Sequence, residues 1–272
     1  MTFRERHHAA IWSLLWPVRW WFTKFPVHRG KGLLMRLVIL PCLPPRPASF
    51  AYRLRGGESV ALFYREDLGT QVLFNGEYED REIAALCAQV TPRTTVFDVG
   101  ANIGLSALEL ARAVGPGGQV IACEPHPDTA ARLKSNLADN AISTVLVEQT
   151  AIGSEPGAIT FHESAQPTLS SASVIPRDLV RSFEVPVTTV DALWAKAGKP
   201  AVSALKIDVE GGELEVLRSA SALLASQKPA ILLEAWGPQQ RDPIDALLVA
   251  AGYRRTQPEG FEPRNYLYLH GA

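Results

Sequence analysis

The chain has 272 residues, 47% of them hydrophobic, and a formal net charge of −1. Its length predicts one large domain with an appendage or two small domains, and its composition supplies a sizeable core. The near-neutral charge lacks the basic excess of nucleic-acid-binding proteins, so we expect no nucleic-acid partner. The cysteines, Cys42, Cys87 and Cys123, are odd in number and lack metal-site spacing, so we expect a reducing, cytoplasmic compartment.

Residues 1–40 differ in composition from the rest of the chain. They contain seven arginines and lysines against the single acid Glu5, together with four of the six tryptophans. Trp12, Trp16 and Trp20 recur every four residues and would share a helix face, although a proline would kink or restart that helix. Basic residues beside aromatic ones are typical of a helix on an anionic membrane surface. Two interpretations stay open: a helical cap on the main domain, which we favour, and a peripheral membrane contact.

This N-terminal segment predicts neither a membrane-spanning helix nor an ordinary secretory signal. Its apolar runs are short and are interrupted by Arg19, Lys24 and Arg36. The proline-rich stretch 41–47 then predicts a stiff linker. We therefore divide the chain into a basic, tryptophan-rich helical segment with its linker, residues 1–46, and a main domain, residues 47–272.

The main domain begins with a predicted hairpin and a helix. Strands are expected over residues 51–54 and 59–64, because these stretches flank a pair of glycines. The stretch Gly76–Glu79 then leads into an amphipathic helix. We expect Tyr78 and Glu79 at the start of this helix, near the mouth of the site, where they could contact a substrate.

The stretch Val96–Gly104 predicts a short buried strand, a tight glycine turn and the start of a helix. Apolar residues continue at helical spacing from Leu105 to Val114. Ligands of doubly wound α/β sheets bind beyond the carboxyl ends of such strands. A dinucleotide would require glycines at Gly-x-Gly-x-x-Gly spacing. Asn102 and Leu105 occupy the second and third glycine positions, so the pyrophosphate-binding turn is incomplete.

Carboxylates around this turn favour S-adenosylmethionine as the cofactor. Asp98 precedes Gly100 by two residues, where it would repel a phosphate but suits the ammonium group of an amino-acid head. A second strand, Gln119–Cys123, ends at Glu124, whose carboxylate could accept hydrogen bonds from both ribose hydroxyls. The alternative role for Glu124 is a helix N-cap before Pro127. The predicted cofactor-binding residues of this region are Asp98, Gly100, Asn102, Gly104 and Glu124.

Strands and helices alternate beyond Glu124, as a parallel sheet requires. A helix over residues 127–140 and a strand over 144–152 are followed by residues 153–202, which break this rhythm. An insertion of this length is typical of a lid or a substrate loop. We expect His162, within the insertion, to line the acceptor side of the site.

A second acidic stretch, Asp208-Val209-Glu210, follows another predicted strand. Strand period two places Asp208 and Glu210 on one face near its end, before Gly211 opens the next helix. We expect both carboxylates to be catalytic residues that face the transferring methyl group. Asp208 would also bind the cofactor, Glu210 would handle the proton of an acceptor hydroxyl, and His162 is a further catalytic candidate. The alternatives are a pair that caps the helix and a pair that binds magnesium or calcium. We assign no metal ligand, and the need for a divalent metal stays open.

The last predicted elements complete the sheet. A fifth strand, Ala230–Leu233, ends at Glu234, which we expect beside the substrate together with Tyr78 and Glu79. Helices are expected over residues 213–225 and 243–251, and an antiparallel pair of strands over residues 253–256 and 266–270.

Two phrases, FDVGANIG at residues 97–104 and KIDVEG at residues 206–211, resemble the signatures of the FkbM family of S-adenosylmethionine-dependent methyltransferases. Glu124 and the strand that ends at Glu234 fit the same resemblance, which covers residues 75–240. The resemblance implies an α/β class I methyltransferase fold. This fold is a Rossmann-like, mostly parallel seven-stranded sheet in the order 3-2-1-4-5-7-6, with an antiparallel last strand.

The resemblance also implies a function, namely transfer of a methyl group from S-adenosylmethionine to a hydroxyl of a small molecule or glycan. Two other classes stay open. One is a non-catalytic nucleotide-binding or membrane-surface module with the same fold, which the intact set of site acids disfavours. The other is an NAD-dependent oxidoreductase, which Asn102 and Asp98 disfavour because they do not suit a pyrophosphate.

Overall fold

A computed structural model describes residues 41, 43, 48–164 and 179–271. These residues form two compact units. The first contains the described residues up to Arg53 together with Ser59–Tyr78, and the second contains Leu54–Glu58 and the chain from Glu79 onward. The predicted tryptophan-rich helix lies outside the described residues, and the boundary after residue 46 stays a prediction.

The first unit is a β-hairpin followed by a helix. Strands β1 (Ser49–Arg53) and β2 (Ser59–Phe63) pair antiparallel, which confirms the predicted hairpin. Helix α4 (Asp67–Asn75) was not predicted, because Gly69 interrupts its apolar pattern. A Cβ at Gly69 would lie 2.0 Å from the carbonyl oxygen of Phe63, so the glycine allows the helix to pack closely on the end of β2.

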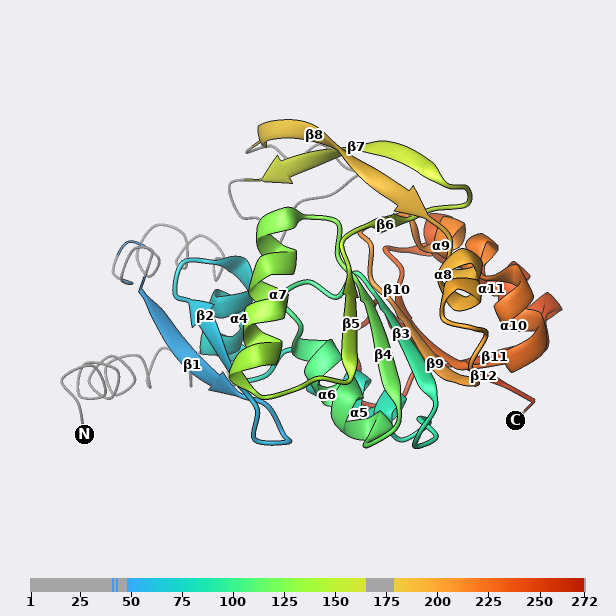
Figure 1. The fold of residues 1–272 in the computed structure, drawn as a ribbon, viewed down its shortest axis with the longest axis horizontal. Coiled ribbons are helices and arrows are strands. Elements are labelled where there is room, and N and C mark those ends of the chain that lie inside the picture. Colours follow the sequence, from blue (N-terminus) through green and yellow to red (C-terminus); the bar gives the residue numbers. More distant parts are fainter. Residues whose placement is uncertain (1–40, 42, 44–47, 165–178, 272) are drawn as a thin grey trace. The chain divides into compact units, whose positions relative to one another are not determined.

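The second unit contains a seven-stranded sheet (Figure 1). Its strands, in spatial order, are β11 (Tyr253–Thr256), β12 (Asn265–His270), β10 (Ala230–Glu234), β9 (Val202–Ile207), β3 (Thr95–Val99), β4 (Gln119–Cys123) and β5 (Val145–Glu148). Strand β12 runs antiparallel to both of its neighbours, and the other neighbouring pairs are parallel. Numbered along the chain, this order is 3-2-1-4-5-7-6, which confirms the predicted class I methyltransferase fold.

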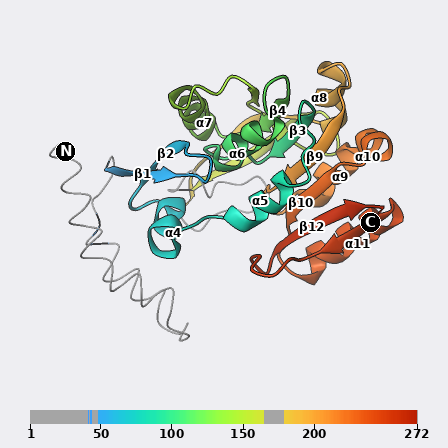
Figure 2. The same cartoon turned by 90° about the horizontal axis from the view of Figure 1, so that it is seen from below.

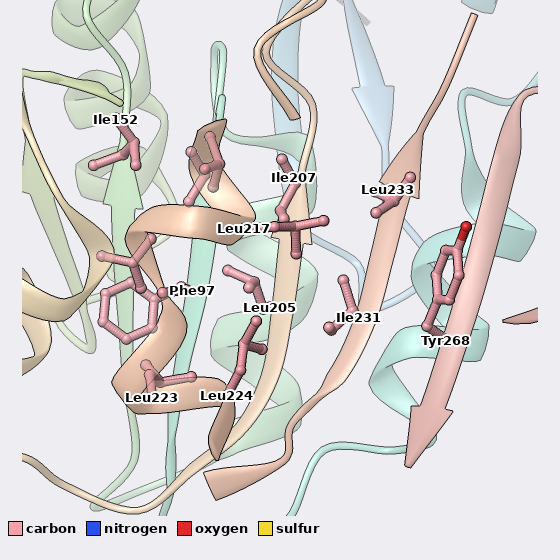
Figure 3. Packing of buried hydrophobic residues seen from close by; sticks show 14 of the residues in the cluster. Phe97, Ile152, Leu205, Ile207, Leu217, Leu223, Leu224, Ile231, Leu233 and Tyr268 are labelled. Carbon is pink, nitrogen blue, oxygen red and sulfur yellow. The ribbon is translucent and has the colours of Figure 1, made fainter. Parts of the chain in front are cut away.

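Helices cover both faces of this sheet (Figure 2). Helices α5 (Asp80–Cys87) and α6 (Leu105–Val114) pack against alternate strand residues such as Val96 and Leu232. The opposite face is covered by α8 (Val190–Lys196), α9 (Glu213–Ser219), α10 (Ser221–Gln227) and α11 (Pro238–Ala250). Figure 3 shows Phe97, Leu205 and Ile231 of this face packed near leucines of α9 and α10. Each such buried side chain contributes about 1.5–3 kcal/mol of stabilisation.

Two predicted helices have different bounds in the structure. The helix expected over residues 213–225 is divided into α9 and α10 at Ala220, where the backbone leaves helical geometry (φ −103°, ψ 16°). Helix α11 begins at Pro238 rather than at Pro243. Proline is favoured at the first helical position, so Pro238 marks the start, and Pro243 is accommodated one turn further along the helix.

The insertion and the two residues before it form a second, small sheet. Strands β6 (Ala151–Ile152), β7 (Gly157–Ser164) and β8 (Leu179–Thr188) lie in the order β6-β8-β7, and β7 pairs antiparallel with β8. The strand predicted over residues 144–152 is therefore two strands, β5 in the main sheet and β6 in the small one. Helix α7 (Pro127–Asp139) connects β4 to β5, as predicted. None of the helices in the described part of the chain is both long and apolar enough to span a bilayer.

Candidate active site

The turn between β3 and α6 depends on residues with positive φ. Gly100, Asn102 and Gly104 have φ values of +82°, +50° and +96°. A Cβ at Gly100 would lie 1.7 Å from the carbonyl oxygen of Asp208, and one at Gly104 would lie 2.3 Å from a methyl carbon of Leu133. The two glycines therefore allow the positive φ values and leave room for the neighbouring atoms, where a side chain would clash. The turn packs directly on the end of β9.

Glu124 connects the end of β4 to this turn. Its Oε2 accepts a hydrogen bond from the backbone N–H of Asn102 (3.0 Å), and its Oε1 accepts one from the N–H of His126 (2.8 Å). Burial raises the pKa of Glu124 to about 7, although these hydrogen bonds favour the carboxylate. The N-cap of α7 is His126, whose Nδ1 accepts from the N–H of Thr129. The alternative interpretation of Glu124 as the helix cap is therefore wrong.

Three charged residues form a line from β3 to the end of β9, and two of them, Asp98 and Lys206, are buried. Asp98 and Lys206 are paired in the sheet register, and Lys206 Nζ lies 4.0 Å from Asp98 Oδ1. Lys206 also donates a hydrogen bond to Asp208 Oδ2 (3.3 Å), while Ser106 donates one to Asp98 Oδ2 (2.7 Å). Asp98 is fully buried, and its Oδ1 has no hydrogen-bond partner within the described residues. This carboxylate can therefore accept a further donor.

Burial and neighbouring charges have opposite effects on the pKa values of Asp98 and Lys206. Burial raises the pKa of Asp98, against the opposing effect of Lys206. Burial would lower the pKa of Lys206, but the carboxylates of Asp208, Asp98 and Glu79 outweigh it and raise that pKa. The lysine therefore remains cationic. We did not predict a site role for Lys206, although a charged residue among the apolar residues of a buried strand was a signal for one.

Three carboxylates converge at the ends of β9 and β10. One oxygen each from Asp208, Glu210 and Glu234 lie within 4.8 Å of one another. Burial and the charges of Asp208 and Glu234 raise the pKa of Glu210 to about 7. Burial and Asp208 also raise the pKa of Glu234, whose carboxylate pairs with Arg264 Nε at 3.2 Å. The structure thus brings the two predicted catalytic carboxylates together with a predicted substrate residue.

Glu79 belongs to the same electrostatic cluster. It is the N-cap residue of α5 and adopts a left-handed backbone (φ 51°). Burial and the charges of Asp208 and Glu234 raise its pKa to about 8, although Lys206 opposes them. Tyr78 ends the first unit, so its predicted contact with the substrate stays a prediction.

This cluster could hold a divalent cation or organise a proton. Magnesium and calcium prefer oxygen ligands such as those of Asp208, Glu210 and Glu234. A proton shared among crowded carboxylates would equally relieve their repulsion, as the raised pKa of Glu210 indicates. With a bound cation the carboxylates would act as metal ligands, and with a shared proton they would act as acid–base groups. In both cases they lie near the glycine turn.

The structure places the two histidines of this region differently. His126 is fully buried, and its ring packs edge-on against Phe161 and Phe183 of the small sheet. His162 lies in β7 next to Phe161, and alternation along the strand turns it to the opposite face, where its Nδ1 lies 2.8 Å from Ser182 Oγ. His162 therefore does not point to the face that meets His126, and its catalytic role stays a prediction.

Comparison with known proteins adds sequence similarity to this geometry. The family described as "Methyltransferase FkbM domain" matches residues 98–255. The chain is 31% identical over 148 residues to the hexuronic acid methyltransferase AglP of Haloferax volcanii, covering 54% of this chain and 59% of that protein. It is 30% identical over 196 residues to the 31-O-demethyl-FK506 methyltransferase FkbM of Streptomyces tacrolimicus, covering 61% and 73%. Methyltransferase sdnD of Sordaria araneosa is 29% identical over 195 residues, with 60% and 74% covered. The match to AglP thus spans less than two thirds of that relative.

Proposed function

The chain belongs to the FkbM methyltransferase family, and from that premise we propose that it transfers the methyl group of S-adenosylmethionine to a hydroxyl of a small molecule or glycan. The names of two relatives support this acceptor class, since one is a hexuronic acid methyltransferase and another is a 31-O-demethyl-FK506 methyltransferase.

The observation that carries the proposal is the carboxylate lining of the glycine turn. Asp98 and Glu124 lie at the ends of adjacent strands beside Gly100. Such a lining would repel a pyrophosphate but complements an ammonium group, a sulfonium and ribose hydroxyls. The buried Oδ1 of Asp98 that has no hydrogen-bond partner within the described residues fits a cofactor that brings a donor.

Glu124 is the group that we assign to the ribose. Each of its oxygens already accepts one backbone N–H, and a carboxylate oxygen has a second lone pair for a hydroxyl donor. The same two hydrogen bonds orient the carboxylate before a ligand arrives. Asn102 and the glycines would bring backbone close to the cofactor, and Asp208, held by Lys206, would position its amino-acid portion.

On the acceptor side, Glu210 is the residue that we assign to the proton. S-adenosylmethionine, when bound, supplies a methyl group on a sulfonium, so positioning is much of the protein's task. A carboxyl group with a pKa of about 7 can accept the acceptor's hydroxyl proton on one of its oxygens near neutral pH. Glu79 and Glu234 lie in the same cluster and would contact the acceptor, while Tyr78 and His162 remain further candidates.

Calorimetry with the full chain tests the cofactor assignment. We expect binding of S-adenosylmethionine and S-adenosylhomocysteine and no binding of NAD. Tight binding of NAD without binding of S-adenosylhomocysteine would favour an oxidoreductase. Cofactor binding without methyl transfer to any hydroxyl compound would favour a non-catalytic module.

The Glu124→Ala variant tests the ribose assignment. Loss of a hydrogen bond to a charged group should weaken binding of S-adenosylhomocysteine by about 1.5–3 kcal/mol. Glu215→Ala is the matched control, because this glutamate lies on the surface of α9 and pairs there with Arg218. Unchanged affinity in a folded Glu124→Ala protein would remove the assignment.

A further inference from the structure

Trp236 presents an aromatic ring beside the acid cluster. It follows Glu234 by two residues, and 52% of it is exposed. The guanidinium carbon of Arg264 lies 3.7 Å from the centre of a Trp236 ring, and Arg264 Nε lies 3.2 Å from Glu234 Oε1. The backbone N–H of Trp236 also donates to Gln240 Oε1 at 2.6 Å. The ring is thus held in place and is connected to the carboxylates by a stacked guanidinium.

Exposure of this ring is unusual for the molecule. Among the large hydrophobic side chains that are exposed in residues 48–164 and 179–271, Trp236 is the only aromatic one. Leaving an indole ring in water forgoes the stabilisation that burial would provide. Arg264 already stacks on the ring, so the area that remains exposed is available to a ligand.

We propose that Trp236 is the platform for the methyl acceptor, and that this acceptor is an uncharged sugar ring. The C–H face of the sugar packs on the indole, while its hydroxyls donate to the carboxylates of Glu234, Glu210 and Asp208. This inference rests on the proposed function, because it assigns the acceptor of the same site.

The two parts of the site match the two parts of a pyranose. The face of an aromatic ring is electron-rich and attracts weakly positive C–H groups, and a pyranose carries such groups on one face. Carboxylates only accept hydrogen bonds, and the edge of a sugar supplies several hydroxyl donors. A flat aromatic acceptor could stack on Trp236 equally well. It would bring few donors to Asp208, Glu210 and Glu234, and unsatisfied acceptors are costly when covered.

Charge disfavours an acidic sugar in this arrangement. Burial and the neighbouring carboxylates raise the pKa of Glu210, so the region already disfavours another negative charge. Arg264 is the nearby cation on the acceptor side, and it is engaged by Glu234 and Trp236. A uronic acid would therefore add a carboxylate to a region that is already rich in carboxylates, and it would have to share Arg264 with Glu234.

The test is saturation-transfer NMR on the full chain, with and without S-adenosylhomocysteine. The probes are methyl glucoside, methyl galactoside and methyl mannoside, with methyl glucuronide and catechol as the acidic and aromatic rivals. We expect at least one neutral glycoside to receive saturation at its ring C–H protons and to bind more tightly than both rivals. Absence of binding by all three glycosides, or tighter binding of a rival, would overturn the proposal.

Variants then test the role of the ring. Trp236→Ala should weaken binding of the neutral glycoside at least tenfold, and Trp236→Phe, which keeps a smaller ring, should weaken it two- to threefold. Val249→Ala is the control, because Val249 is also exposed but lies on α11. Equal glycoside affinity in wild type and Trp236→Ala would overturn the platform.

Cofactor affinity separates this inference from the function on which it rests. Trp236→Ala should bind S-adenosylhomocysteine as the wild type does, which also shows that the variant is folded. A wild type that failed to bind S-adenosylhomocysteine would refute the proposed cofactor, while the glycoside data recorded without it would still decide the sugar platform.

Discussion

Glu210 lies on a left-handed backbone (φ 56°), between Asp208 and a glycine that opens α9. A non-glycine residue in this conformation costs on the order of 1–3 kcal/mol and persists where the surrounding structure holds it. One of its carboxyl oxygens lies within 4.8 Å of oxygens from Asp208 and Glu234. This backbone conformation thus goes with the position of the Glu210 side chain in the carboxylate cluster.

The proton role of Glu210 predicts a selective loss. Glu210→Gln should bind S-adenosylhomocysteine normally and lower methyl transfer by about 10²–10⁴-fold, the range for a positioned acid–base group. Calorimetry and a methyl-transfer assay on each protein measure the two effects, with Glu215→Gln on the surface of α9 as the control. Chelation by EDTA should leave the wild-type rate unchanged. Normal turnover in Glu210→Gln would return the residue to a structural role, and loss of activity in EDTA would make it a metal ligand.

Two partly buried carboxyl groups also predict how stability depends on pH. In the folded protein the pKa values of Glu210 and Glu79 are raised to about 7 and about 8, above the ordinary value of 4.5. The folded state therefore binds protons more tightly than the unfolded state between these values. Its extra stability is fully present below about pH 4.5 and is lost as pH rises through 7–8.

Urea unfolding at a series of pH values measures this dependence. The free energy of unfolding should fall from pH 5 to pH 8, by about 1–2 kcal/mol for each such carboxyl group after solvent screening. Glu210→Gln should show a shallower fall, because one of the contributing groups is gone. A free energy that rises over this interval would contradict the assigned pKa directions.

At the scale of elements, the β3–α6 turn and the end of β9 are built against each other. Gly100 combines a positive φ with a backbone carbonyl in the place where a Cβ would stand. Gly57 has a similar φ of +97°, but no atom lies within 4 Å of its missing Cβ. Substitution of Gly57 therefore measures the cost of the backbone conformation alone. Substitution of Gly100 measures that cost together with the cost of the steric contact with Asp208.

Alanine substitution at the two glycines should give unequal effects. Gly57→Ala should lower the free energy of unfolding by about 1 kcal/mol, the cost of the left-handed backbone alone. Gly100→Ala should lower it by at least about 3 kcal/mol and abolish cofactor binding, because Asp208 must also move. Urea unfolding and calorimetry measure the two effects. Equal losses at both positions would show that the contact with β9 does not constrain the turn.

At the scale of the whole molecule, the N-terminal 46 residues present a separate question. We propose that they either cap the catalytic domain or contact a membrane surface, because their basic, tryptophan-rich composition differs from the rest of the chain. In neither role would these residues be needed for binding of the cofactor. The residues that we assign to the cofactor lie between Asp98 and Asp208.

Truncation at Pro47 should therefore leave the affinity for S-adenosylhomocysteine unchanged. Calorimetry on the truncated and full chains measures this directly. Flotation of the full chain with anionic but not neutral liposomes would support the membrane contact over the cap. A folded truncated protein without cofactor affinity would show that the boundary is misplaced.

Local sequence patterns were sufficient to predict several elements of this protein. The strand at Phe97, the glycine turn and the helix that follows are encoded by apolar spacing and by residues that tolerate positive φ. The family resemblance supplied the strand order, which the structure confirms. Helix α4 and the division at Ala220 were missed, because their sequence patterns are ambiguous over short lengths.

The sequence by itself determined which residue types stand at the strand ends: the carboxylates Asp98, Glu124, Asp208, Glu210 and Glu234 and the glycines between them. Only the tertiary structure decided which of them meet. Sheet register pairs Asp98 with Lys206, and the packing of α5 brings Glu79 into the field of Asp208. The tertiary structure also stacks Arg264 on Trp236, and it places His162 on the face of β7 opposite Phe161. The physical reason is that spacing along a strand specifies a side chain's face, whereas its neighbours come from distant segments whose positions depend on the packing of the whole sheet.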